Sequence, residues 1–352
     1  MPGKWVFSQW AAWLFALLFA VAAPGFAGAA DGSSKEQVQR QATQPQNNAP
    51  VWRDVRGGDN RSQTTQVRGV ETSVLVQTEG EVWRRIRNGP ITVYGGWLLI
   101  VVCAIIAGIY YGKGAIKLHE KPSGRMVERF NSLERIAHWT MGISFCVLGV
   151  TGLIILFGKY ILIPVLGYTV FSWLAIFSKN AHNFVAPLFI VSLLVFIVIY
   201  VKDNLPQKGD RAWLSRGWRM FAGEHMPSWR FNAGEKVWFW IGVVLLCLVV
   251  SASGLILLFP NFEQGRLLMQ QASVIHAIAA LLVMGYSLGH IYMGTIGVEG
   301  AYENMRSGYA DETWVKEHHN YWYNEVMAGK GIAGGAAPST ARASSVKEGW
   351  KL

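Results

Sequence analysis

The sequence predicts an all-α membrane protein: a transmembrane bundle with a core of four helices plus one additional N-terminal span, after a signal peptide. Of its 352 residues, 51% are hydrophobic and only 15% are charged, whereas soluble proteins carry about 25% charged residues. Five intervals without a charged residue each reach the roughly 20 residues that cross the hydrocarbon core of a bilayer. They are residues 88–112, 136–158, 180–201, 237–262 and 267–298. A soluble enzyme with one large core is excluded, because five long apolar runs would need a far larger polar shell.

The net charge of +10 and the three cysteines exclude further classes of protein. The basic residues lie between the apolar intervals rather than in a strip with aromatic side chains, so we expect no nucleic-acid partner. Cys103, Cys146 and Cys247 all fall inside apolar intervals, which leaves no disulfide framework and no cysteine-ligated cluster. The chain has no CxxCH string either, so any haem must be held without a covalent link.

The N-terminal residues follow the order of a secretory signal peptide. Lys4 precedes an apolar run of 13 residues, Ala11 to Ala23, and Pro24 then ends the run ahead of the small residues 27–29. Because this run is too short for a comfortable span, residues 1–30 are predicted to be a signal peptide. The alternative is an uncleaved sixth helix, which would export the following segment equally.

Residues 31–90 are rich in Gln, Asn, Gly and Arg and cannot bury enough apolar surface to fold alone. We expect an extended periplasmic arm that orders on a partner; the alternative is a free tail. Residues 91–112 are then the first transmembrane helix, and residues 130–298 hold the other four.

Loop charge predicts the orientation of the spans. The loops at 113–135 and 202–236 contain six and seven Lys or Arg residues, whereas those at 158–179 and 260–266 contain two and one. By the positive-inside rule the basic loops face the cytoplasm. The chain is therefore expected to cross a bacterial inner membrane several times, with the N-terminal arm in the periplasm and residues 299–352 as a cytoplasmic tail.

The apolar stretch from Tyr160 to Ser178 is a further candidate span of 19 residues. A span there would leave almost no residues for a turn and would put the two basic loops on opposite sides of the membrane. Because Pro164 and Gly167 also fit an irregular segment, we expect this stretch at the periplasmic surface, as a short helix lying flat.

Four of the eight histidines lie in or at the edges of the predicted spans, where an ionisable side chain is costly and usually functional. They are His138, His182, His276 and His290. The other four lie in loops or in the tail, and we expect each of them to be solvated. They are His119, His225, His318 and His319.

The last span carries two of the membrane histidines at two depths. His276 and His290 are 14 residues apart, which places them about 21 Å apart along a helix axis and within about 40° of one face. Matching the depths pairs His276 with His182 near the periplasmic side, and His290 with His138 near the cytoplasmic side.

Two histidine pairs at two depths in a helix bundle are what two b-type haems require. Each iron then takes two axial imidazoles and keeps no open position for oxygen chemistry. The sequence therefore predicts two haem b groups, one on His138 and His290, the other on His182 and His276. The alternative for each histidine is a hydrogen-bonded interhelical side chain. Zinc fits less well, since neither pair has a third or fourth carboxylate or thiolate ligand.

Six strings between residues 129 and 325 resemble the cytochrome b, or gamma, subunit of membrane-bound respiratory formate dehydrogenases. They are RFNSLERIAHW (129–139), the segment around His182, RFNAGEK (230–236), IHA (275–277), GHIYM (289–293) and KEHHNYWY (316–323). The resemblance implies that residues 130–298 form a dihaem cytochrome b core of four helices. It also implies a site for quinone, either menaquinone or ubiquinone, on the cytoplasmic side at Asn232 and Gly234. The alternative for Asn232 is a helix N-cap, which Asn favours before an apolar run.

The resemblance further implies that this chain anchors a complex and does not itself oxidise formate. A catalytic subunit with molybdenum or tungsten would oxidise formate, and a periplasmic iron–sulfur subunit would deliver the electrons that this chain passes to quinone. Two alternatives stay open. One is the cytochrome b subunit of another respiratory dehydrogenase, such as a nickel–iron hydrogenase; the other is a haem-free transporter or scaffold in the membrane lipid.

Overall fold

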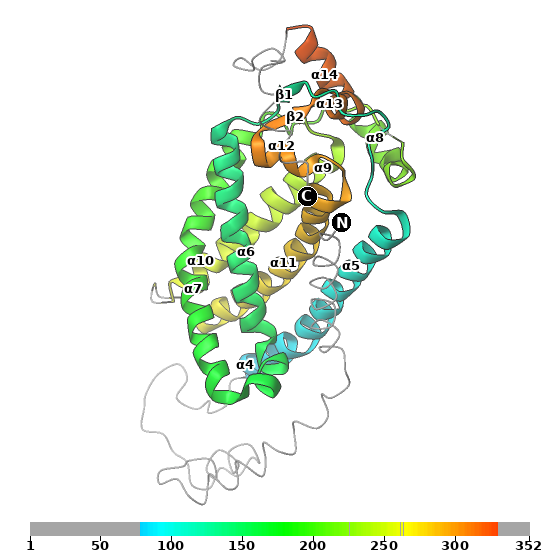
Figure 1. Ribbon diagram of the computed structural model, residues 1–352. Helices are drawn as coiled ribbons and strands as arrows, with labels where there is room; N and C mark the ends of the chain where they lie inside the picture. Colours follow the sequence, from blue (N-terminus) through cyan, green and yellow to red (C-terminus); the bar gives the residue numbers. More distant parts are fainter. Residues whose placement is uncertain (1–77, 225, 261, 263, 330–352) are drawn as a thin grey trace, which may run out of the picture.

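The computed structural model describes residues 78–224, 226–260, 262 and 264–329. Within these residues, five helical segments are long and apolar enough to cross a membrane, and they pack as a bundle (Figure 1). Their bounds are Gly80–Lys113, Ser132–Ile161, Ile163–Tyr200, Ala233–Leu258 and Leu267–Gly297. The predicted all-α bundle, with one span ahead of a core of four, is confirmed. The expected signal peptide lies outside the described residues.

Several of these segments consist of more than one helical element. The first is α4 (Thr78–Ile86), the π-helical η2 (Arg87–Ile91) and α5 (Thr92–Lys113); the second is α6 (Ser132–Ile161) and the third α7 (Ile163–Tyr200). The fourth is α9 (Ala233–Val237), the π-helical η4 (Trp238–Leu246) and α10 (Cys247–Leu258); the fifth is α11 (Arg266–Tyr292) and the π-helical η5 (Met293–Gly297). The shorter elements are β1 (Met126–Glu128), α8 (Asp210–Arg216), the 3₁₀-helical η3 (Gly217–Ala222), α12 (Ala301–Ser307), β2 (Tyr309–Asp311), α13 (Glu312–His318) and α14 (Asn320–Met327). We call the end of the bundle that carries β1 and β2 the strand end, and the end with the α6–α7 connection the hairpin end.

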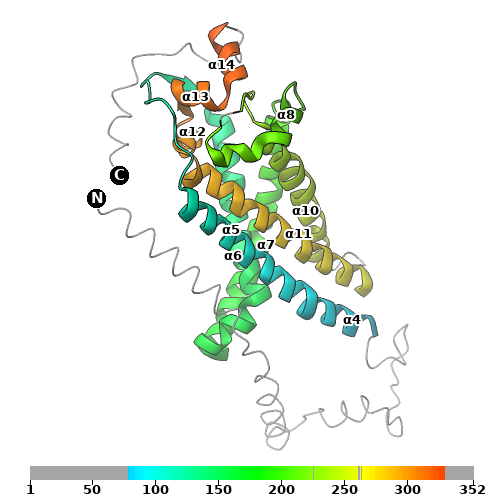
Figure 2. The same ribbon diagram turned by 90° about the vertical axis from the view of Figure 1, so that its right-hand side faces the viewer.

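The α6–α7 hairpin corrects the expectation of a flat helix at residues 160–178. α6 continues to Ile161 and α7 begins at Ile163, so most of this stretch belongs to a long helix. Pro164 stands in the first turn of α7, where its missing N–H is not needed. A kink at Gly167, with φ 73°, separates this first turn from the long helix that follows. Both helices exceed the roughly 20 residues of a span, and their connection is the lowest part of the described chain in both views (Figure 1 and Figure 2).

The first span starts earlier than expected, because residues Thr78–Ile91 are helical rather than part of an extended arm. Glu81 and Arg84 form an ion pair one turn apart, at 2.8 Å, a contact that supports an exposed helix end. Pro90 cannot donate to an α-helical ladder, and the chain takes a π-helical turn at that point. Residues 31–77 of the expected arm lie outside the described residues.

The first span packs against α11 and the end of α6. Their shared core contains Ile91, Leu99, Phe157 and Leu281. Gly95 permits the close approach, since a Cβ there would stand 2.3 Å from Cδ1 of Leu281. The first span therefore covers one side of the helix that carries two of the four membrane histidines.

The segment that was expected to be a tail is folded at the strand end. β1 pairs antiparallel with β2, with Met126 opposite Asp311. The sheet packs with α13 and α14 around Val127, Ala310, Trp314, Val315 and Trp322. Residues 299–329 thus form a small unit with the connector before α6, and residues 330–352 lie outside the described residues.

Candidate functional site

At the strand end, the structure brings together His138 on α6 and His290 on α11. Their ring centres lie 6.2 Å apart, with the ring planes at 56°. Trp238, at the start of η4, stacks on His290 at 5.1 Å and 14°, and the ring of Phe196 on α7 lies 6.2 Å from that of His138. Aromatic contacts therefore surround this pair.

Nearer the hairpin end, His182 on α7 faces His276 on α11. Their ring centres are also 6.2 Å apart, with the planes at 73°. Nδ1 of His276 lies 3.0 Å from the carbonyl oxygen of Val250. Because a carbonyl oxygen only accepts, this Nδ1 carries the proton and Nε2 is left as a ligand nitrogen. The structure thus brings together the same two pairs that matched depths predict.

Both pairs fit a planar cofactor with a metal at its centre. A metal about 2 Å from one nitrogen of each of two imidazoles places the two ring centres about 6 Å apart, which matches both pairs. None of the four histidines is fully buried, and His290 is exposed, so a planar group can reach each ring. Among the described residues, no group of three or more His, Cys, Asp or Glu side chains could hold a metal ion. A cofactor that brings the remaining ligands itself therefore fits better than a bare ion.

An internal repeat begins two of the long helical segments at the strand end. The string RFNxxE occurs at residues 129–134 and again at residues 230–235. In each copy the Asn side chain accepts from the backbone N–H of the Glu, and the Glu side chain accepts from the N–H of the Asn. These capping boxes begin α6 and α9.

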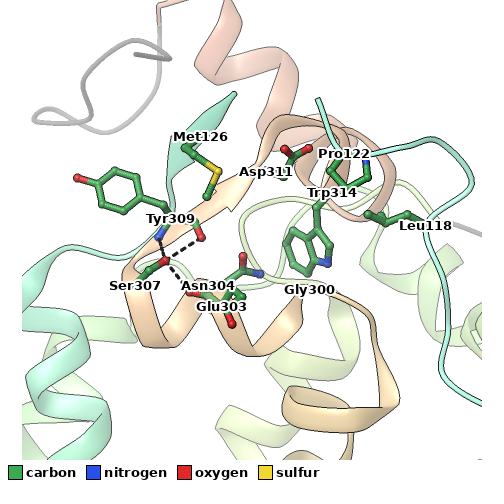
Figure 3. Close-up of a pocket in the computed structure, with 10 residues that line it drawn as sticks. All are labelled: Leu118, Pro122, Met126, Gly300, Glu303, Asn304, Ser307, Tyr309, Asp311 and Trp314. Carbon is green, nitrogen blue, oxygen red and sulfur yellow. Dashed lines mark hydrogen bonds between the residues drawn. The ribbon is translucent and has the colours of Figure 1, made fainter. Parts of the chain in front are cut away.

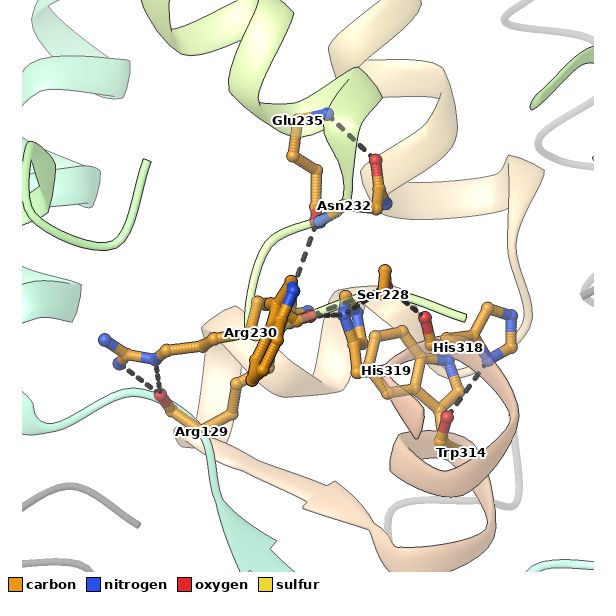
Figure 4. Close-up of polar contacts among 9 residues, drawn as sticks. Arg129, Ser228, Arg230, Asn232, Glu235, Trp314, His318 and His319 are labelled. Carbon is orange, nitrogen blue, oxygen red and sulfur yellow. Dashed lines mark hydrogen bonds and ion pairs between the residues drawn. The ribbon is translucent and has the colours of Figure 1, made fainter. Parts of the chain in front are cut away.

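The arginines of the repeat cross between the two copies (Figure 4). Arg230 donates from Nη2 to both carboxylate oxygens of Glu134 at 2.8 Å, and Nη2 of Arg129 lies 3.2 Å from Oε1 of Glu235. Each arginine also donates to the carbonyl oxygen of the other. We call Arg129, Glu134, Arg230 and Glu235 the clasp. This contact was not predicted, although the recurrence of RFNxxE in the sequence is the signal that could have shown it.

Asn232 and Gly234, which the resemblance assigns to quinone, both have structural roles at the start of α9. Asn232 is the N-cap, and its Oδ1 accepts from the N–H of Glu235 at 2.9 Å. Gly234 faces the ring of Trp213 on α8, which a Cβ would meet at 2.8 Å. A capping oxygen leaves the amide nitrogen of Asn232 to donate to a ligand, so the quinone role stays a prediction.

The expectation that His319 is solvated is wrong. Its side chain is 1% exposed, and Nδ1 lies 2.5 Å from the carbonyl oxygen of Trp229 and 3.2 Å from Oγ of Ser228 (Figure 4). Burial, with the nearby charge of Arg129 and the neighbouring His318, holds the pKa of His319 well below its usual value. A neutral His319 thus ties α13 and α14 to the segment that precedes α9.

The other three histidines that were expected to be solvated differ in their surroundings. His318 is half-buried and stacks on Trp314 at 4.7 Å, so it is not a freely solvated side chain. His119 is exposed, as expected. His225 lies outside the described residues.

A small cavity at the strand end is lined by Met126, Asn304, Asp311 and Trp314, among others (Figure 3). Its volume is about 20 Å³, enough for a single water molecule. Asn304 is 2% exposed, and its amide atoms have no hydrogen-bond partner within the described part of the chain. The cavity is too small for a quinone ring. Its lining includes none of the four membrane histidines and neither Asn232 nor Gly234.

The chain is similar in sequence to cytochrome b556 subunits of formate dehydrogenases. The chain is 28% identical over 213 residues to the nitrate-inducible formate dehydrogenase cytochrome b556(Fdn) subunit of Escherichia coli (strain K12), which covers 57% of this chain and 92% of that protein. It is 28% identical over 209 residues to the formate dehydrogenase cytochrome b556(fdo) subunit of the same strain, with 57% and 93% covered. It is 26% identical over 209 residues to the formate dehydrogenase cytochrome b556 subunit of Haemophilus influenzae, with 57% and 84% covered. The predicted resemblance is confirmed.

The family model for prokaryotic cytochrome b561 matches residues 129–308, just over half of the chain. The matched region holds all four membrane histidines and both copies of RFNxxE, and it leaves out the first span. A cytochrome b binds haem b, a planar cofactor that brings its own ring nitrogens to the iron, as the paired imidazoles require. This integral membrane protein therefore belongs to the prokaryotic cytochrome b561 family.

Proposed function

We propose that this chain is the dihaem b subunit of a membrane-bound formate dehydrogenase. It would anchor the complex and transfer electrons from a periplasmic iron–sulfur subunit across the membrane to quinone. The observation that carries the proposal is the presence of two histidine pairs, each with ring centres 6.2 Å apart, at two depths along α11. Sites about 21 Å apart along the helix axis extend over most of a hydrocarbon core of about 30 Å.

Four side chains would hold the two haem b groups, His138 with His290 and His182 with His276. Between two imidazoles, a haem exchanges one electron and offers no open iron position. The chain supplies the surroundings: apolar helices exclude water, and Trp238 holds the plane of the His290 ring by stacking on it.

The partner subunits are inferred from the relatives, whose names describe them as subunits of formate dehydrogenases. A catalytic subunit with molybdenum or tungsten and an iron–sulfur subunit would supply the electrons. The three cysteines of this chain are free side chains inside three different spans, so a cluster would have to belong to a partner. Membrane lipid would cover the outer faces, where Phe184 and Val198 of α7 are 87% and 75% exposed.

In this proposal the strand end faces the cytoplasm of a bacterial cell and the hairpin end faces the periplasm, because the basic loops lie at the strand end. Protease added outside intact spheroplasts that lack the partner subunits is expected to cut the arm before residue 78 and to spare a C-terminal epitope. The same protease added to inverted membrane vesicles should remove the epitope. Loss of the epitope from the outside would contradict the orientation.

Difference spectra of the purified complex test the proposed function. We expect two haem b per chain, both reduced on addition of formate and both reoxidised by added quinone. Reduction by hydrogen and not by formate would favour the nickel–iron hydrogenase alternative. A complex that purifies without haem absorption would overturn the proposal in favour of a haem-free transporter or scaffold.

The proposed quinone site at Asn232 and Gly234 is tested by Asn232→Asp. Aspartate keeps an oxygen that caps α9, and its charge is favourable at a helix N-terminus, so we expect normal folding and haem content. An ionised carboxylate cannot donate a hydrogen bond to a quinone carbonyl, so reoxidation of the formate-reduced complex by quinone should slow about tenfold, the worth of one hydrogen bond.

The matched control is Asn131→Asp, because Asn131 caps α6 through the same two hydrogen bonds and has no proposed ligand. Normal reoxidation in both variants would make Asn232 a cap only, and the pocket would then be sought elsewhere around His290. Equal slowing in both variants would show that the effect comes from the helix starts and not from quinone.

A further inference from the structure

A second internal repeat lies beside the hairpin-end histidine pair. Its copies are TGLI on α6, at residues 151–154, and SGLI on α10, at residues 253–256. In both copies the hydroxyl faces a histidine: Oγ1 of Thr151 is 2.9 Å from Nδ1 of His182, and Oγ of Ser253 is 3.3 Å from Nδ1 of His276. The two rings of this pair are thus approached by equivalent residues of two different helices, α6 and α10.

The glycine that follows each hydroxyl lets the imidazole lie against the helix backbone. A Cβ on Gly152 would stand 3.5 Å from Cε1 of His182, and a Cβ on Gly254 would stand 3.2 Å from Cε1 of His276. The first distance is ordinary van der Waals contact, whereas the second is tighter than usual, so a side chain at Gly254 would press on the ring of His276. The repeat therefore places each ring against a helix backbone and beside a hydroxyl group.

Each hydroxyl is set to accept a hydrogen bond from its imidazole. Oγ1 of Thr151 lies 2.8 Å from the carbonyl oxygen of Val147, and Oγ of Ser253 lies 2.6 Å from that of Val249, one turn back on the same helix. A carbonyl oxygen can only accept, so the hydroxyl proton goes to it and the hydroxyl lone pairs face Nδ1. Nδ1 of the histidine is then the protonated nitrogen, and Nε2 is the ligand.

A backbone carbonyl supplements the hydroxyl at His276. The carbonyl of Val250 is 3.0 Å from Nδ1 of His276 and so is closer than the Ser253 hydroxyl. At His182 the hydrogen-bond partner of Nδ1 is the hydroxyl of Thr151, which at 2.9 Å is the nearer of the two hydroxyls. Removal of a hydroxyl should therefore have its larger effect at His182.

The strand-end pair lacks this arrangement. Nδ1 of His138 is buried and has no hydrogen-bond partner among the described residues. The carbonyl of Glu134, one turn back on α6, accepts instead from the hydroxyl of Tyr200 at 3.0 Å. His290 is held by its stacking on Trp238. Both pairs thus consist of histidines, but a hydroxyl faces Nδ1 of each histidine only in the hairpin-end pair.

We propose that Thr151, with a smaller contribution from Ser253, is a positioning residue that lowers the midpoint potential of the hairpin-end haem below that of the strand-end haem. The inference rests on the two haems of the proposed function. A hydrogen bond from Nδ1–H to oxygen raises the basicity of the imidazole, and a more basic axial ligand stabilises ferric over ferrous iron. Side chains on α6 and α10 thereby make electron transfer from the hairpin end to the strand end energetically favourable.

A potentiometric measurement on the purified complex, followed in the haem absorption bands, tests this inference. The unmodified complex should show two one-electron components. Thr151→Val keeps the side-chain shape and removes the hydroxyl. Only the midpoint potential of the lower component should then rise, by about 59 mV, which is a tenfold change in the oxidised-to-reduced ratio. Thr151→Ser retains the hydroxyl and should restore the unmodified value. Ser253→Ala should give a smaller shift of the same sign.

Several outcomes overturn the inference. The first is a Thr151→Val complex with full haem content and two unchanged potentials; another is an equal movement of both components, which would report a general disturbance of the bundle. If Thr151→Val loses the haem, Ser253→Ala becomes the deciding variant. An unchanged potential of the lower component in Ser253→Ala would then overturn the proposal. Fewer than two haem b per unmodified chain would instead overturn the proposed function, and the spectrum shows this before any variant is made.

Discussion

His182→Ala and His276→Ala are each expected to remove the hairpin-end haem and leave the other, whereas His138→Ala and His290→Ala remove the strand-end haem. The reason is that, in the proposed function, each haem would be held without a covalent link by two imidazoles whose ring centres are 6.2 Å apart. Loss of even an outer hydrogen bond to a ligand weakens metal binding about 10- to 100-fold, and loss of the ligand itself should cost more. Haem content per chain should fall from two to one in all four variants.

The identity of the haem that remains tests the pairing. The two members of a pair should leave the same component in a potentiometric measurement, and the two pairs should leave different components. His119→Ala is a suitable control, because this histidine is exposed and lies in the connector before α6; it should keep both haems. If His182→Ala and His290→Ala lost the same haem, the pairing would be wrong.

Arg230→Ala is expected to cost about 3–5 kcal/mol of stability, the usual effect of removing one partner of a buried ion pair. The side chains of Arg230 and Glu134 are 8% and 9% exposed, so the variant leaves a carboxylate out of water without its cation. Arg230→Lys is not expected to restore full stability. Lysine lacks the planar guanidinium group that reaches both carboxylate oxygens of Glu134 and the carbonyl oxygen of Arg129. Denaturant unfolding followed by helical circular dichroism measures the loss.

The matched control for that experiment is Arg84→Ala. Arg84 and Glu81 form an ion pair at 2.8 Å, but their side chains are 57% and 43% exposed, and such surface pairs contribute little. We expect no measurable change in the unfolding midpoint. An Arg230→Ala protein as stable as this control would show that the clasp does not hold the bundle together.

The sequence predicts the spans and the pairing of the membrane histidines because both follow from strong constraints. Charge is excluded from a bilayer core, so charge-free intervals locate the helices. The fixed rise of a helix then turns the 14-residue spacing of His276 and His290 into two depths. Matching these depths to those of the other two histidines pairs His138 with His290 and His182 with His276.

Other features depend on contacts between distant residues, which local patterns do not show. The segment Thr78–Ile91 is polar in composition, yet it is helical and places Ile91 in a core with Leu281 of α11. β1 and β2 have three residues each, too few for an alternating pattern to stand out. His319 is buried because Ser228 and Trp229, about 90 residues earlier, face it.

The clasp also bears on how the chain is made. Glu134 leaves the ribosome 96 residues before Arg230, so the α6–α7 hairpin is synthesised while its carboxylate has no arginine to meet. A carboxylate at the edge of a membrane span is costly until it is paired. The clasp between the two halves of the bundle can therefore form only once the second RFNxxE copy has emerged. α6 and α7 are thus made before the start of α9 can pair with them, and a chain truncated before residue 230 would leave Glu134 without its arginine.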